Sequence, residues 1–122
     1  MSLQESARQF AVESARTAYE LKCEEIVVMD LRDLSGVTDF FVIATGTSDR
    51  QLRSVAERIE EYGRRVGSRV FGRAGYDLGQ WVLLDFVDVV VHIFDRERRA
   101  YYDLELLWGD APKIDWALSA SA

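Results

Sequence analysis

The stretch from Gln80 to Gly109, QWVLLDFVDVVVHIFDRERRAYYDLELLWG, decides the fold of this chain. Two apolar runs of strand character flank Val87 and Asp88, and a segment with short helical periodicity follows them. The same stretch holds two of the three tryptophans and the only histidine. We therefore expect a β-hairpin followed by short helices, with the rest of the chain packed around it.

A two-residue turn at Val87 and Asp88 would pair Phe86 with Val89, and side-chain alternation then divides the hairpin into two faces. One face is uniformly apolar and is the predicted core: Val82, Leu84, Phe86, Val89, Val91 and Ile93. The other mixes large apolar groups with an acid and a histidine, as interfaces do: Trp81, Leu83, Asp85, Val90, His92 and Phe94. A three-residue loop would shift the pairing by one residue and mix these sets.

Upstream of the hairpin, periodicity predicts two helices and three further strands. An amphipathic helix runs from Leu3 to Leu21, and a second follows Gly46, with Thr47 or Ser48 as its N-cap. The strands are predicted at 26–31, 40–44 and 69–72. These elements indicate an α/β fold, with a mixed sheet of about five strands and flanking helices.

Downstream of the hairpin, Asp95 and Asp103 are placed to cap two short helices. The second helix should run from Leu104 to Trp108, with Leu104, Leu107 and Trp108 on one side, and should end at Gly109. We expect a single domain over residues 3–116 and a short tail over 117–122.

Composition restricts the class of protein. The chain is 48% hydrophobic and 30% charged, which is ordinary for a globular domain. Its start shows no secretory signal, and no stretch approaches the roughly 20 apolar residues of a membrane span. The single cysteine, Cys23, suits a reducing cytoplasm and makes a poor zinc site. We therefore expect a cytoplasmic protein without a metal.

Charge is unevenly distributed along the chain. Residues 1–49 and 74–122 each carry about −5, whereas residues 50–73 carry about +4. The acidic segments favour a basic partner protein. The arginines of residues 50–73 are open to two interpretations: a solvated helix face, or a contact with RNA phosphates.

Two groups could suggest catalysis. The Gly46-Thr47-Ser48 junction resembles the phosphate-binding start of a nucleotidyltransferase helix, but we interpret it as the N-cap of an ordinary helix. Such an enzyme also needs paired acids to hold magnesium. Asp85 and Asp88 flank a turn and form no such pair. His92 has no second histidine, cysteine or serine at a telling spacing.

Three long segments carry a family resemblance: TDFFVIATGTSDRQ, WVLLDFVDVVVHIF and YYDLELLWGDAP. Together they resemble the Iojap family of ribosomal silencing factors, called RsfS in bacteria, over roughly residues 7–116. The resemblance implies a nucleotidyltransferase-like fold without the catalytic acids, hence no enzymatic activity and no cofactor. It also implies a translational repressor that binds ribosomal protein L-fourteen on the large ribosomal subunit and blocks joining of the small subunit when nutrients are scarce.

The resemblance assigns roles to particular residues. Trp81 matches the family tryptophan of the ribosome contact, and Asp85 and Asp88 match the acids beside it. Where the family commonly has glycine in the hairpin turn, this chain has Val87, which disfavours a left-handed turn.

From these matches and the second hairpin face, we predict the partner-binding residues Trp81, Leu83, Asp85, Asp88, His92, Phe94, Tyr102 and Asp103. We expect Trp81 and Phe94 to be exposed, and to offer a point for homodimer formation when the protein is free. The alternatives are a nucleotide-binding enzyme and a large-subunit assembly factor that contacts ribosomal RNA through the arginines.

Overall fold

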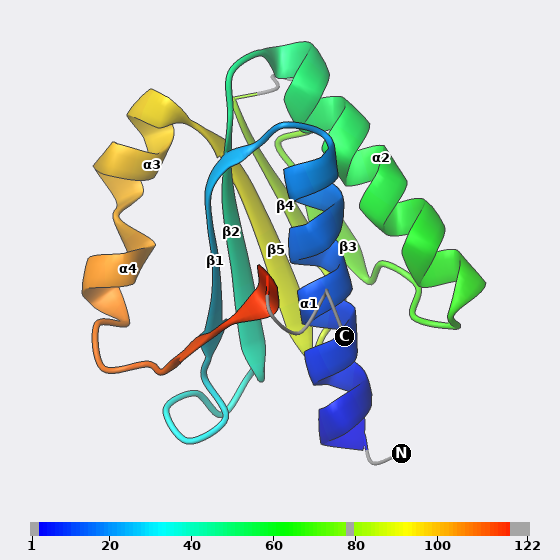
Figure 1. The fold of residues 1–122 in the computed structure, drawn as a ribbon, viewed down its shortest axis with the longest axis vertical. Helices are drawn as coiled ribbons and strands as arrows, with labels where there is room; N and C mark the ends of the chain where they lie inside the picture. The colour runs from blue at the N-terminus through cyan, green and yellow to red at the C-terminus, as the bar shows by residue number, and fades with distance from the viewer. Residues whose placement is uncertain (1–2, 78–79, 118–122) are drawn as a thin grey trace.

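A computed structural model describes residues 3–77 and 80–117 of the chain. A single six-stranded mixed sheet, in the order β3-β4-β5-β2-β1-β6, forms its centre (Figure 1). The elements in chain order are α1 (Leu3–Glu20), β1 (Glu24–Asp30), β2 (Phe40–Gly46), α2 (Asp49–Arg65), β3 (Gly72–Ala74), β4 (Trp81–Asp85), β5 (Val89–Asp95), α3 (Arg96–Tyr102), α4 (Leu104–Leu107) and β6 (Lys113–Ile114). The predicted α/β class is confirmed.

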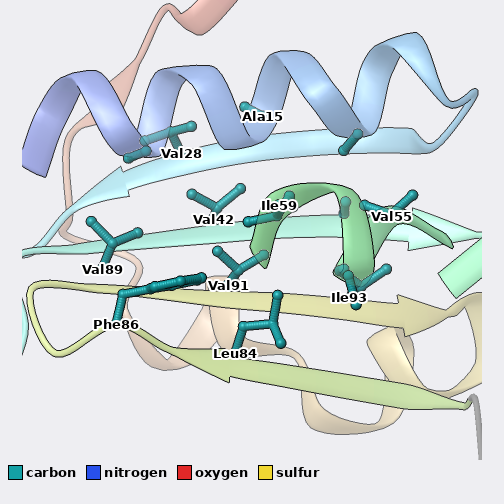
Figure 2. Packing of buried hydrophobic residues seen from close by; sticks show 14 of the residues in the cluster. Ala15, Val28, Val42, Val55, Ile59, Leu84, Phe86, Val89, Val91 and Ile93 are labelled. Carbon is teal, nitrogen blue, oxygen red and sulfur yellow. The ribbon is translucent and has the colours of Figure 1, made fainter. Parts of the chain in front are cut away.

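Helices α1 and α2 cover one face of the sheet, which we call the first face (Figure 1). The apolar hairpin face predicted as core lies here, and all six of its side chains are buried. Figure 2 shows Ala15 of α1 and Val55 and Ile59 of α2 packed among strand residues from β1, β2, β4 and β5. Burying one such branched side chain stabilises the fold by about 1.5–3 kcal/mol, so this face carries much of the stability.

The start of α2 has the local structure of a capped helix. The Ser48 hydroxyl accepts a hydrogen bond from the Gln51 N–H at 3.1 Å. In return, the Gln51 side chain accepts the Thr47 N–H at 2.6 Å and donates to the Leu21 carbonyl at 2.8 Å. A Cβ on Gly46 would lie 2.3 Å from the Leu52 side chain, so close packing explains the glycine. Helix capping therefore accounts for the Gly-Thr-Ser junction.

The hairpin turn lies at Val87 and Asp88, as predicted. Phe86 N–H donates to the Val89 carbonyl at 2.9 Å, and Trp81 stands opposite Phe94 in the ladder. Val87 adopts the left-handed conformation, with φ of 76°. Its N–H is held by the Asp85 carboxylate at 2.7 Å. This side-chain hydrogen bond stabilises a backbone conformation that valine rarely adopts.

The two edges of the sheet differ from the prediction. The strand expected at 69–72 lies later in the chain, as β3 (Gly72–Ala74). Its partner β4 ends at Asp85, opposite Gly72, so the residues before Gly72 have little strand left to pair with. At the other edge, β6 pairs with β1 and was not predicted. Just beyond it, the Trp116 indole N–H donates to the Ile26 carbonyl at 3.1 Å, while the predicted tail from residue 118 lies outside the described residues.

The two short helices after β5 confirm one predicted cap and contradict the other. The Asp95 carboxylate accepts the Arg98 N–H at 2.7 Å. Asp103 makes no side-chain cap to α4, because its own backbone is left-handed, with φ of 44°, and serves as the junction between the helices. Leu104, Leu107 and Trp108 were predicted on one side of the second helix, but only Leu104 and Trp108 pack against buried residues, and Leu107 is 71% exposed.

Candidate functional site

The second face of the sheet is covered only in part. Segment 104–111 lies over β1 and β2 and buries a small apolar cluster: Met29, Leu31, Ile43, Phe94 and Ala111. On the hairpin strands β4 and β5, Trp81, Leu83 and Val90 are only partly buried. Helices α1 and α2 lie on the other side of the sheet, so this face offers the open part of the sheet surface (Figure 1).

A chain of contacting rings crosses the second face, and we call it the aromatic row. The Trp81 ring lies 4.7 Å from that of Tyr102 and 6.1 Å from that of His92, centroid to centroid. Phe41 continues the row, 4.8 Å from His92 and 6.1 Å from Trp108. In order, the row is Trp108, Phe41, His92, Trp81, Tyr102 and Tyr101. Its members come from β2, β4, β5, α3 and the end of α4.

His92 is a structural member of this row. Its Nδ1 accepts the Trp81 indole N–H at 3.3 Å. Burial lowers the pKa of His92 from 6.5 to about 4, so the ring is neutral at physiological pH. A histidine with a pKa this far below 7 is a weak general base, and its burial keeps it from contact with a substrate.

The structure corrects one expectation about this face and shows a second residue to be buried. Phe94 was expected to be exposed, but it is 1% exposed and lies under Trp81 and Tyr102. His92 is 5% exposed. Strand alternation places both residues on the second face correctly, but it cannot reveal that Trp81, Tyr102 and segment 104–111 cover them.

Exposed apolar side chains gather instead on α3 and α4. Tyr101, Leu106 and Leu107 each expose more than two thirds of their surface, and Tyr102 beside Trp81 is 44% exposed. Of these four, sequence reasoning named only Tyr102 as a site residue. The sequence signal for the other three is the apolar content of YYDLELL. Two short helices, of seven and four residues, cannot turn every one of these side chains toward the sheet.

The acids named from the sequence lie at two separate places, and one of them, Asp88, borders a hollow on the first face. Tyr102 and the exposed Asp103 lie near Trp81, at the start of β4. Asp85 and Asp88 lie at the hairpin turn. Asp85 is four residues from Trp81, which is a distance of roughly 13 Å at a strand rise of about 3.3 Å per residue. Asp85 is half-buried and engaged by the turn, whereas the Asp88 side chain is exposed. Asp88 and Asp103 therefore present the freer carboxylates.

Arg99 fixes the helical part of this surface to the sheet, and sequence reasoning missed it. Its guanidinium is buried and donates to the Thr45 hydroxyl at 2.9 Å and to the Glu25 carbonyl. The same group holds Glu105 of α4 at 2.8 and 3.0 Å. One side chain thereby ties α3 and α4 to β1 and β2. Loss of such a buried, multiply bonded ion pair is strongly destabilising.

The remaining candidates for a functional site are a metal centre and a hollow on the first face. Within residues 3–77 and 80–117, no group of three or more metal-ligating side chains comes together. A hollow of about 480 Å³ lies on the first face, between the start of α1, the end of α2 and the hairpin turn. Its lining is largely apolar, with Phe10, Tyr62 and Phe86 among its residues, and it includes Asp88. The helices that the structure describes include none long and apolar enough to cross a membrane.

Comparison with known proteins agrees with the fold and with the sequence motifs. The family model described as "Ribosomal silencing factor during starvation" matches residues 4–122. A ribosomal silencing factor RsfS of Bacillus subtilis is 40% identical over 102 residues, covering 84% of this chain and 86% of that protein. One from Chromobacterium violaceum is 34% identical over 121 residues, covering 99% and 95%. The chloroplastic protein Iojap of Zea mays is 39% identical over 106 residues, 87% of this chain but 46% of that protein.

Solved structures give the same result. A crystal structure of a Chromobacterium violaceum protein superposes with a TM-score of 0.79 at 34% identity, covering 89% of this chain and 88% of that one. One from Bacillus halodurans gives 0.75 at 33% identity, covering 91% and 98%. With the family match over nearly all residues, these similarities show that the chain belongs to the RsfS family of ribosomal silencing factors.

Proposed function

We propose that this protein is a translational repressor that binds the large ribosomal subunit through ribosomal protein L-fourteen. By occupying that surface, it would prevent the small subunit from joining when nutrients are limited. The observation that carries the proposal is the aromatic row on an uncovered sheet face, flanked by exposed apolar residues on α3 and α4. Family membership supports the same function, since the relatives are named ribosomal silencing factors.

The chemistry of the surface supports a basic protein as the partner. Trp81 and Tyr102 supply large amphipathic rings, the residue types that most often anchor interfaces. Around them, residues 74–122 carry about −5 charges, with Asp88 and Asp103 exposed. Repression of this kind requires only steric exclusion, and the surface needs no catalytic group for it. The proposed docking surface therefore consists of Trp81, Leu83, Asp88, Tyr101, Tyr102, Asp103, Leu106 and Leu107, with Asp85, His92 and Phe94 as its support.

The arginines of α2 belong to a different side of the molecule. Arg50, Arg58 and Arg64 are exposed on a helix that covers the first face, whereas Trp81 lies on the second. Figure 1 shows α2 on the opposite side of the sheet from α3 and α4. Any contact of these arginines with ribosomal RNA would therefore be a separate contact, and would survive loss of Trp81.

Co-sedimentation with purified large subunits tests the proposal. We expect the wild-type protein to sediment with the subunits, and Trp81→Ala and Asp88→Lys to remain in the supernatant. Phe71→Ala is the matched control, because Phe71 is an aromatic residue with 79% exposure in the segment before β3 and is not a member of the aromatic row. Folded Trp81→Ala that binds like the wild type would overturn the site. Capture of purified L-fourteen by the wild type alone would identify the partner within the subunit.

Three associated points are tested by separate measurements. A cytoplasmic location is proposed from the family and is checked by fractionating cells. Self-association of the free protein would use Trp81, Tyr101 and the exposed leucines of α4, because Phe94 is buried. Sedimentation velocity should then show a dimer that Leu106→Asp weakens. Calorimetry with ATP and magnesium distinguishes the nucleotide-binding alternative, for which our proposal expects no heat of binding.

A further inference from the structure

The Trp81 indole is restrained on several sides within the free protein. Its ring stacks on Phe94 at 5.4 Å and contacts Tyr102 at 4.7 Å. Its only hydrogen-bonding group, the indole N–H, donates to His92 Nδ1 at 3.3 Å. Packing restricts where the rings lie, but the hydrogen bond selects which edge of the indole points inward.

We propose that His92 is a positioning residue of the docking surface: it fixes the orientation of the Trp81 indole for the partner while making no contact with the partner itself. The proposal rests on the proposed function, in which Trp81 is the anchor. It revises the sequence-based expectation that His92 binds the partner directly.

Burial supports an indirect role. His92 is 5% exposed, and its ring is packed between Phe41, 4.8 Å away, and Phe94, 5.8 Å away. A partner that docks on the second face meets Trp81 and Tyr102 before it could meet this imidazole. Direct contact would require the aromatic row to open.

The hydrogen bond also fixes the tautomer of His92. An indole N–H can only donate, so Nδ1 must be the unprotonated acceptor and the proton of the neutral ring must lie on Nε2. That Nε2 is buried and finds no hydrogen-bond partner among the described residues. A buried donor without an acceptor destabilises the fold, and a phenylalanine or leucine would fill the same space without it. What an apolar residue cannot supply is the acceptor for Trp81.

A fixed indole has a direct consequence for binding. An anchor that already occupies its bound orientation loses less conformational entropy on docking than one that rotates freely. Loss of the hydrogen bond should therefore weaken docking by about fivefold, the scale of one neutral hydrogen bond, even though every residue that touches the partner is unchanged.

The test compares two substitutions at position 92. His92→Phe keeps an aromatic ring but removes the acceptor. His92→Asn restores one, because the asparagine side-chain oxygen, like Nδ1, is bonded directly to Cγ. Val91→Ala is the control: it removes core volume on the first face and lowers stability without touching Trp81.

Two measurements are made on each variant. The first is the indole N–H resonance of Trp81 in a nitrogen-15 correlation spectrum, assigned by its loss in Trp81→Phe. The second is the dissociation constant for purified large subunits. We expect His92→Phe to move the resonance toward that of an unbonded indole and to weaken binding about fivefold. His92→Asn should restore both toward wild type, and Val91→Ala should change neither.

The outcomes separate this inference from the proposed function. Normal binding by Trp81→Ala would overturn the proposal that Trp81 anchors the partner. The indole resonance would still show whether Trp81 donates its hydrogen bond to His92. If Trp81→Ala abolishes binding but His92→Phe binds like the wild type, the positioning role is overturned, whether or not the resonance moves. Equal weakening by His92→Phe and Val91→Ala would likewise overturn it, because that result reduces His92 to general stability.

Discussion

Lowering the pH from 7 to 5 should destabilise this protein through one identifiable group, His92. In the folded chain the pKa of His92 is about 4, because burial disfavours the imidazolium. In the unfolded chain it returns to its ordinary value of 6.5. The unfolded state therefore binds an additional proton across this interval. The contribution is complete above pH 6.5 and is lost progressively as the pH falls toward 4.

The size of the effect follows from the two pKa values. One pKa unit corresponds to about 1.4 kcal/mol, so the free energy of unfolding should fall by about 2 kcal/mol between pH 7 and pH 5. By pH 4 the loss should reach about 3 kcal/mol. His92 is the only histidine in the chain, and carboxylates titrate mainly below pH 5, outside the interval from pH 7 to pH 5. The Arg32 guanidinium lowers the pKa of Asp30 further, which moves its contribution to still lower pH.

The measurement is urea unfolding followed by far-ultraviolet circular dichroism at half-unit steps of pH. His92→Asn is the comparison, since it does not titrate and should give a nearly flat profile from pH 7 to pH 5. The reasoning is refuted if the wild type is equally flat over this range. It is also refuted if His92→Asn shows the same slope, because another group would then be responsible.

Three further predictions concern other parts of the fold. Val87→Gly should stabilise the protein by about 1 kcal/mol, because relief of a left-handed valine exceeds the added freedom of glycine; a lower urea midpoint would contradict this. Gly63→Ala should lower the melting temperature, although alanine normally favours a helix by about 1 kcal/mol, and a gain in stability would be inconsistent with the structure. The reason is that the new Cβ would lie 2.3 Å from the Ser68 carbonyl oxygen. Cys23 is buried, with a pKa raised to about 11, so Ellman's reagent at pH 8 should react with it only as fast as the protein unfolds, and rapid labelling without denaturant would show otherwise.

The parts of the fold that could be predicted are those specified by short-range patterns. Alternation along residues 81–94 identifies the core face because a strand has a period of two residues, and the turn at Val87 fixes the register. The cap at Ser48 is equally local, since its partner Gln51 lies three residues away. In both cases the residues that interact are close in sequence.

The parts that could not be predicted depend on contacts between distant segments. Two residues, Lys113 and Ile114, carry little strand signal of their own and become β6 only because β1 offers a free edge. Phe94 lies on the predicted face, but whether that face is covered depends on Trp81, Tyr102 and segment 104–111. Arg99 looks like a surface arginine in the sequence, and its burial follows from acceptors on β1, β2 and α4. These features need the fold before they can be recognised.

The pairing of β1 with β6 imposes an order of assembly on the nascent chain. β1 can pair with β2 as soon as residues up to Gly46 have been synthesised, whereas its other edge waits for Lys113 and Ile114. Until then, unpaired backbone groups beside a strongly apolar strand are available to any other extended chain. A strand of two residues, followed by Trp116 on the Ile26 carbonyl, closes that edge. This short segment therefore protects the sheet from misassembly with neighbouring chains only once the chain is nearly complete.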